Sequence, residues 1–161
     1  YQESLNRILR IIVAQSHADR CCVFKLDREA GVIRRRFDYC DFGIEHFHNT
    51  DGVYPFPADF LQTEWFKLLE NHEIACGDDL STPEGSGPFA DVRGYLQQTG
   101  LKSVIVAGIR FRGELWGGIA VDYLRKPYAF TESSRQIMRA AANLVELSLI
   151  RREHTRELEQ P

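Results

Sequence analysis

Cysteine and histidine are the residue types of this chain that could do chemistry most directly, as nucleophiles or as metal ligands. The chain has four cysteines: Cys21, Cys22, Cys40 and Cys76. They contain no Cys-x-x-Cys pair, and Cys21 and Cys22 stand side by side in a predicted strand, so they face opposite ways. In a chain of this size we expect free thiols in a reducing compartment, and therefore a cytoplasmic protein.

The histidines offer a second possible chemistry. His46 and His48 have Cys40 and Asp51 near them in the sequence. These are ligand types for a metal, but they lack the paired spacing of a zinc site. His46, His48 or His72 could also bind a haem iron. Single histidines in loops are usually exposed to solvent, so the sequence supports neither a metal nor a haem.

Composition excludes some partners. The 161 residues fit one domain with a full core, and the net charge of −3 gives no electrostatic reason to bind nucleic acid or an anionic membrane. The longest apolar runs are far short of the ~20 residues that span a bilayer, and no signal peptide is visible. The chain lacks an initiator methionine. We expect it to be a segment of a longer protein.

The other elements must be placed around residues 101–123, which read LKSVIVAGIRFRGELWGGIAVDY. Two apolar, β-branched runs, 103–109 and 115–121, flank a polar turn in which Gly113 can take a positive φ. This pattern predicts a β-hairpin. Both runs are apolar at successive positions, which predicts central strands that are covered on both faces.

Amphipathic helices are predicted at both ends, over residues 3–16 and from Thr131 through 159. The remaining predicted elements are strands over 19–26 and 32–39 and short helices near 59–69 and 89–96. Because strands and helices do not alternate, the order predicts an antiparallel sheet with helices on its faces. The last helix would be ~28 residues, or about 42 Å, long. Its end therefore suits an output rod or a dimer stalk.

Three stretches carry a family resemblance: RFDYCDFGI (36–44), YLQQTGLKSVIVAGIRFRGELWGGIAVDY (95–123) and AFTESSRQIMRAAANLVELSL (129–149). In these stretches the chain resembles the GAF domain family of sensory modules, which are related in fold to PAS domains. GELWG with its following strand is typical of GAF domains near bacterial sensor histidine kinases and phytochromes. The match covers most of the chain. It indicates a GAF domain over 1–150 and the start of a signalling helix or linker over 151–161.

The resemblance implies an α+β, GAF/PAS-like fold. A central antiparallel sheet of about six strands would carry the N- and C-terminal helices on one face. Loops and short helices would roof a pocket on the other face. The resemblance also implies a homodimer through the terminal helices, which would pass a change of state to a neighbouring PAS, kinase, cyclase or phosphodiesterase domain.

The sequence can be compared with the motifs by which other GAF domains bind their known ligands. The bilin attachment motif places Cys-His before a Tyr-Leu pair, and alignment on Tyr95-Leu96 puts Asp91 and Val92 at those positions. Cys76 could substitute for the missing thiol, but we do not expect a bilin. The Asn-Lys…Phe…Asp-Glu series of cyclic-nucleotide-binding GAF domains is not recognisable either. The cysteines do not match those of GAF proteins that reduce methionine sulfoxide, so we expect no catalysis.

Aromatic side chains are the best markers of a pocket. They come from the elements that should surround the face away from the terminal helices, and two residues could add polar groups. The candidates are Tyr39, Phe56, Trp65, Phe89, Tyr95 and Trp116, with Asp79 and Ser103 as the polar pair. An aromatic cleft with few polar groups suits a planar small molecule. The alternative is that these rings only fill the core.

The sequence therefore predicts a non-catalytic sensory domain of a signalling protein, in first place a two-component sensor histidine kinase. It would bind a small ligand and relay its state through the terminal helices. Two alternatives stay open: a structural dimerisation module without a ligand, and a regulatory domain of a cyclic-nucleotide cyclase or phosphodiesterase.

Overall fold

The computed structural model describes residues 2–44 and 51–159. The elements, with η for a 3-10 helix, are α1 (Gln2–Ser16), β1 (Arg20–Asp27), β2 (Val32–Cys40), β3 (Val53–Pro55), η1 (Phe60–Gln62), α2 (Glu64–Glu70), β4 (Ala75–Gly77), α3 (Pro83–Ser86), η2 (Gly87–Val92), α4 (Arg93–Gln97), β5 (Ser103–Phe111), β6 (Glu114–Tyr123) and α5 (Glu132–Glu159). The long terminal helices and the β5–β6 hairpin lie where the sequence predicts them.

The strands form one six-stranded sheet in the order β3-β2-β1-β6-β5-β4. Every neighbouring pair is antiparallel. The α+β class and the sheet of about six strands are thus confirmed. Strands β1 and β6 lie at its centre, and both are buried on both faces over most of their length. That placement explains their nearly continuous apolar sequence.

The β5–β6 hairpin has the geometry that its turn residues predict. Arg112 and Gly113 both have positive φ, 52° and 80°, as a tight two-residue turn requires. Before the turn, the register shifts between Ile109 and Arg110. The backbone N–H of Arg110 donates to the side chain of Glu146 on α5, at 2.9 Å. This hydrogen bond, made at the register shift of β5, connects the hairpin to the last helix.

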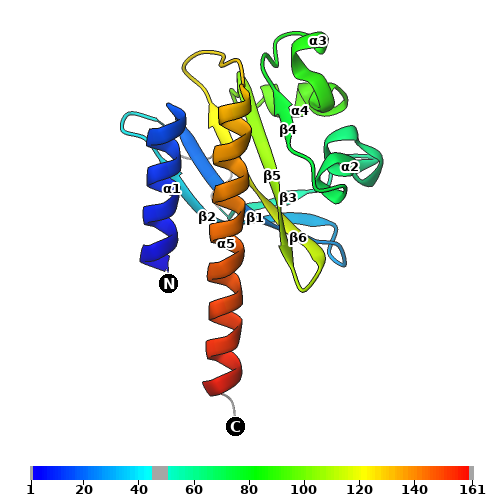
Figure 1. The fold of residues 1–161 in the computed structure, drawn as a ribbon. Helices are drawn as coiled ribbons and strands as arrows, with labels where there is room; N and C mark the ends of the chain where they lie inside the picture. Colours follow the sequence, from blue (N-terminus) through cyan, green and yellow to red (C-terminus); the bar gives the residue numbers. More distant parts are fainter. Residues whose placement is uncertain (1, 45–50, 160–161) are drawn as a thin grey trace.

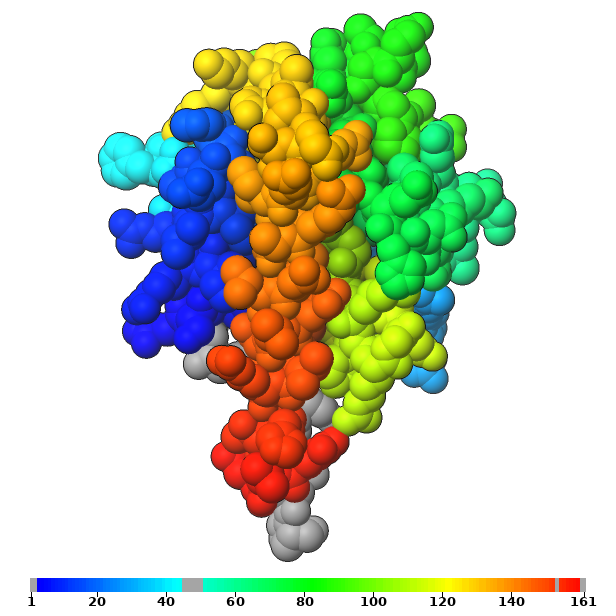
Figure 2. Space-filling model, in the orientation of Figure 1, coloured from blue at the N-terminus to red at the C-terminus, as the bar shows by residue number. Residues whose placement is uncertain are grey.

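Helices α1 and α5 lie side by side, antiparallel, over one face of the sheet (Figures 1 and 2). Their buried side chains, among them Leu5, Leu9, Met138 and Val145, pack on that face. A second apolar core lies on the other face, between the sheet and the layer of short helices that includes α2, η2 and α4. The sheet therefore separates two cores, as the predicted architecture requires.

Helix α5 continues past the end of the sheet (Figure 1). On its outer side Leu144, Leu147, Ile150 and Leu158 are all about half exposed or more. In the described part of the chain no helix combines the length and the apolar character needed to cross a membrane.

Candidate functional site

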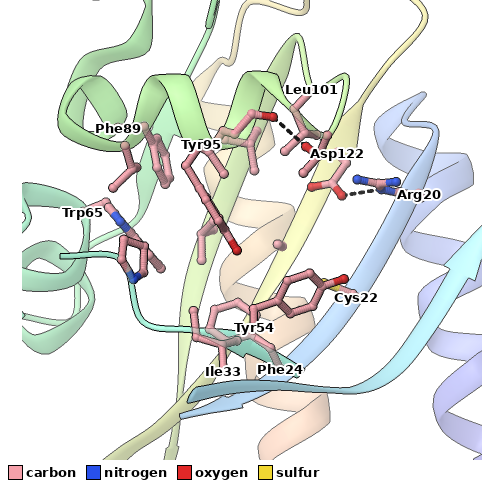
Figure 3. A pocket seen from close by; sticks show the side chains of 17 residues that line it. Arg20, Cys22, Phe24, Ile33, Tyr54, Trp65, Phe89, Tyr95, Leu101 and Asp122 are labelled. Carbon is pink, nitrogen blue, oxygen red and sulfur yellow. Dashed lines mark hydrogen bonds and ion pairs between the residues drawn. The ribbon is translucent and has the colours of Figure 1, made fainter. Parts of the chain in front are cut away.

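A pocket of about 150 Å³ lies between the sheet and the layer of short helices (Figure 3). Strands β1, β5 and β6 supply its floor, in which Phe24, Val106 and Ala120 are apolar side chains. The roof comes from α2, η2 and α4, which supply Trp65, Phe89 and Tyr95. A mostly apolar pocket of this kind suits an organic ligand better than an ion.

The two central strands serve both faces of the sheet, because side chains alternate along a strand. On β1, Cys22 and Phe24 line the pocket, whereas Cys21 and Val23 belong to the core beneath the terminal helices. On β6, Ala120 and Asp122 face the pocket, and Ile119 and Val121 face the helices. A displacement of either strand therefore acts on both cores.

A buried ion pair stands in the pocket wall. Arg20 and Asp122 are register partners on β1 and β6, and the Arg20 Nε donates to Asp122 Oδ2 at 2.7 Å. Both side chains are only 4% exposed. Burial raises the pKa of Asp122, and the charge and hydrogen bond of Arg20 oppose that rise. Burying this charge pair costs free energy of folding. The pair also gives the pocket wall a polar group that the polar edge of a ligand can contact.

The roof is a group of stacked and tilted rings. The Trp65 ring lies 5.5 Å from the Phe89 ring in a stacked arrangement and 5.4 Å from Phe60 in an edge arrangement. Trp65 is 8% exposed. Among residues 2–44 and 51–159, its Nε1 is the buried side-chain nitrogen or oxygen that has no hydrogen-bond partner.

Helix α2, which carries Trp65, is fixed at both ends. At its start the Thr63 hydroxyl donates to the carbonyl of Phe60, at 2.6 Å. At its end the Arg110 guanidinium donates to the carbonyls of Leu69 and Glu70, at 3.1 and 2.6 Å. A cation at this end also suits the helix dipole. The indole is therefore held in a defined place.

The cysteines are free thiols, as the sequence predicts. Cys22 lines the pocket, and burial raises the pKa of its thiol strongly. The thiol is the protonated form at neutral pH, so it is a poor nucleophile for attaching a ligand.

The structure brings three of the predicted pocket residues together: Trp65, Phe89 and Tyr95 all line the pocket. Phe56 lies outside the lining, where its ring stacks on that of Phe60 at 4.4 Å. Asp79 accepts hydrogen bonds from the backbone and hydroxyl of Ser81, which lower its pKa.

The other three residues predicted to line the pocket lie elsewhere in the fold. Tyr39 and Trp116 pack against the core beneath the terminal helices, because they stand at the other parity of their strands. Ser103 is buried and joins two backbone segments, since its hydroxyl donates to the carbonyl of Asp78 and accepts from the N–H of Tyr128. These three residues do not reach the pocket.

Several residues that line the pocket were not predicted from the sequence, above all Arg20, Cys22, Tyr54 and Asp122. Asp122 did leave a signal, because it is a carboxylate at the end of the apolar run GGIAV. A charge in a central strand needs a partner. Its partner is set by the pairing of β1 with β6, which the sequence does not reveal.

The structure describes only one of the three histidines that were considered, and not supported, as haem or metal ligands. His46 and His48 lie outside the described residues, and His72 is an exposed residue with positive φ after α2. Within 2–44 and 51–159, no group of three or more histidine, cysteine or acidic residues could hold a metal ion.

Fold and pocket together define a small α+β module with a pocket on one face of its sheet. Residues 1–149 match the GAF domain, and the chain belongs to the GAF domain family. It is a sensory domain of a family that is generally non-catalytic. No curated protein matches the chain.

Several solved structures share this fold. JSC1_58120g3 in its far-red absorbing dark state, with bound biliverdin IXa, has a TM-score of 0.74 at 14% identity, over 90% of this chain and 86% of that one. GAF3 of Slr1393 from Synechocystis sp. PCC6803, in its photoproduct state, has a TM-score of 0.72 at 13% identity, over 99% of both chains. The blue-light absorbing form of the PixJ GAF domain from Thermosynechococcus elongatus has 0.71 at 13%, over 98% and 92%.

These findings correct one prediction. No bilin is expected from the sequence, because Asp91 and Val92 stand where the attachment motif has Cys-His, and that prediction is wrong. One of these structures carries biliverdin, and the other two are a photoproduct state and a blue-light absorbing form of GAF domains. The motif tests only the covalent attachment of a bilin, so its absence does not exclude one.

Proposed function

We propose that this chain is a ligand-sensing domain that holds a planar, largely apolar molecule between its sheet and its short helices. The observation that carries the proposal is the apolar pocket whose floor strands, β1 and β6, also form the core beneath α1 and α5. A bilin is the first candidate, because JSC1_58120g3, a structure of the same fold, has biliverdin IXa bound. Bound here, a bilin would supply a conjugated system that absorbs visible light.

The pocket fits such a ligand in chemistry, and it must widen to fit one in size. Rings of Trp65, Phe89 and Tyr95 offer apolar faces, and Arg20 with Asp122 offers charge and hydrogen bonds. The volume of about 150 Å³ is below the ~300–1,000 Å³ of pockets for drug-sized ligands. A bilin would therefore displace the short helices away from the sheet. That displacement is a means of signalling.

Arg110 gives the displaced layer a direct connection to the last helix. Its guanidinium holds the end of α2, and its backbone N–H donates to Glu146 of α5. A shift of α2 thus acts on α5 through one residue, in addition to the route through the strands. A ligand that favours one position of α2 biases the position of α5 by its differential affinity.

We also propose that α5 pairs with its copy in a homodimer. Ala140, Leu144, Leu147 and Leu158 are exposed and follow a heptad spacing, with Arg151 and His154 at the two positions between. A second copy would cover this stripe. In this proposal residues 1–150 form the sensory unit, and the following residues lead to the output domain of a cytoplasmic sensor histidine kinase.

The test is a titration of the purified chain with biliverdin, followed by visible absorption and thermal unfolding. We expect a saturable change of the biliverdin band and a higher melting temperature, because the ligand binds the folded form. A panel of planar heterocycles runs in parallel. If neither biliverdin nor the panel changes the melting temperature, the ligand-sensing proposal is wrong and the dimerisation module remains.

The dimer is tested separately by light scattering. Leu144→Glu with Leu147→Glu should convert a dimer to a monomer, because charges replace the apolar stripe. Asn143→Glu, on an exposed neighbouring position of α5, is the matched control and should stay dimeric. A wild-type chain that is monomeric at high concentration would contradict this part.

A further inference from the structure

A buried donor in the pocket wall lacks a partner. Trp65 is 8% exposed, and its Nε1 is the unpartnered buried polar side-chain atom of the described chain. Buried polar groups nearly always have a hydrogen-bond partner, and one left without a partner is unfavourable. A ligand that supplies an acceptor to this N–H therefore gains free energy that a purely apolar ligand does not.

The donor is also preorganised. The indole contacts the rings of Phe60 and Phe89, and it stands on a helix whose last carbonyls accept hydrogen bonds from Arg110. It has little freedom to turn toward another acceptor. A rigid donor loses little conformational entropy when a ligand binds, so its hydrogen bond contributes to selectivity.

The rest of the pocket indicates what carries the acceptor. In Figure 3 the indole lies across the pocket from Arg20 and Asp122, with Tyr95 between them. The floor is apolar, and a cavity of about 150 Å³ is the size that takes a benzene-like ring. The space next to the donor is thus suited to a flat ring with a polar edge.

We infer that the ligand is a planar ring bearing a carbonyl acceptor, and that the Nε1–H of Trp65 donates to that carbonyl. This inference rests on the proposed function, because it assigns the chemistry of a ligand in the same pocket. A lactam ring has this chemistry, whether it is the end ring of a bilin or a small molecule by itself.

The experiment follows the two indole N–H signals of the ¹⁵N-labelled chain by NMR. The chain has two tryptophans, and Trp116 on the other face of the sheet is an internal control for Trp65. Three probes are added: oxindole, which is a planar lactam; indane, which has a similar two-ring frame without an acceptor; and biliverdin. Trp65→Phe assigns the signals and removes the donor while keeping an aromatic ring.

We expect oxindole and biliverdin to shift the Trp65 N–H signal downfield and to leave that of Trp116 in place. Indane should bind without this shift. Trp65→Phe should weaken oxindole binding about tenfold and leave indane binding unchanged. The shift is read on the wild type, so it does not depend on the folding of the variant.

The outcomes separate the two proposals. Binding with the Trp65 signal unmoved, or equal oxindole affinity of wild type and variant, overturns the inference and leaves the proposed function standing. Failure of all three probes to bind contradicts both. A shift with biliverdin alone supports the inference with a bilin as the source of the lactam, and a shift with oxindole alone supports it with a free small molecule.

Discussion

Filling the pocket should stabilise the chain and abolish ligand binding at the same time. Ala120 lies on β6 at the pocket floor, next to Cys22 of β1 and Val106 of β5 in the pairing register. Ala120→Ile adds three carbons to a space that holds no side chain. At about 0.8 kcal/mol for each buried carbon, we expect the free energy of unfolding to rise by about 2 kcal/mol.

The matched control is the same substitution on the other face. Ala141 on α5 is 2% exposed and belongs to the core between the terminal helices and the sheet. Ala141→Ile should lower the free energy of unfolding by about 1–3 kcal/mol, because the larger side chain must push α5 away from the sheet. Urea unfolding measures both variants, and a titration with biliverdin measures binding.

Two results would contradict this prediction. If Ala120→Ile destabilises the chain as much as Ala141→Ile does, the floor of the pocket offers no usable space. If Ala120→Ile binds biliverdin as tightly as the wild type, the ligand occupies another place.

Three further predictions concern the surroundings of the pocket. Arg20→Met should lower the free energy of unfolding by about 3–5 kcal/mol, because it leaves the carboxylate of Asp122 buried without its partner, whereas Arg20→Met with Asp122→Leu should restore most of the loss in urea unfolding. Hydrogen bonds from Arg125 and from the Phe42 backbone lower the pKa of Asp41, so the ionised carboxylate stabilises the fold above pH ~4, and this contribution is lost as the pH falls through the lowered pKa. The difference in unfolding free energy between the wild type and Arg125→Met, measured by urea unfolding from pH 6 to 2.5, should therefore shrink in acid. A constant difference would contradict this prediction. Gly117→Ala should prevent β6 from pairing normally with β1, because the added carbon would lie 1.9 Å from the Phe24 carbonyl oxygen, and circular dichroism that shows an unchanged melting temperature would disprove the close approach.

The fold could be predicted because its signals are local. Two β-branched runs around Gly113 predict the β5–β6 hairpin. An apolar stripe predicts α5, which the structure places at Glu132–Glu159. The class of sheet followed from the order of the elements. Each of these inferences depends on spacing within one segment.

The pocket could be predicted only in part, because it depends on which segments meet. Roof residues such as Trp65 and Phe89 follow from their short amphipathic helices. Tyr39 and Trp116 lie on the other face of the sheet. A shift of one residue in strand register moves a side chain from one face to the other, and composition does not fix that register. The Arg20–Asp122 pair joins residues that are 102 positions apart, so no local pattern indicates it.

The state of the pocket should reach the terminal helices on the other face of the sheet. Hydrogen exchange with and without saturating biliverdin, in the wild type and in Arg110→Leu, tests it most directly. We expect changed protection in α2 and in α5 of the wild type, and a smaller change in α5 of the variant, in which the route through β1 and β6 remains. Unchanged protection of α5 in a saturated wild-type chain would contradict the account.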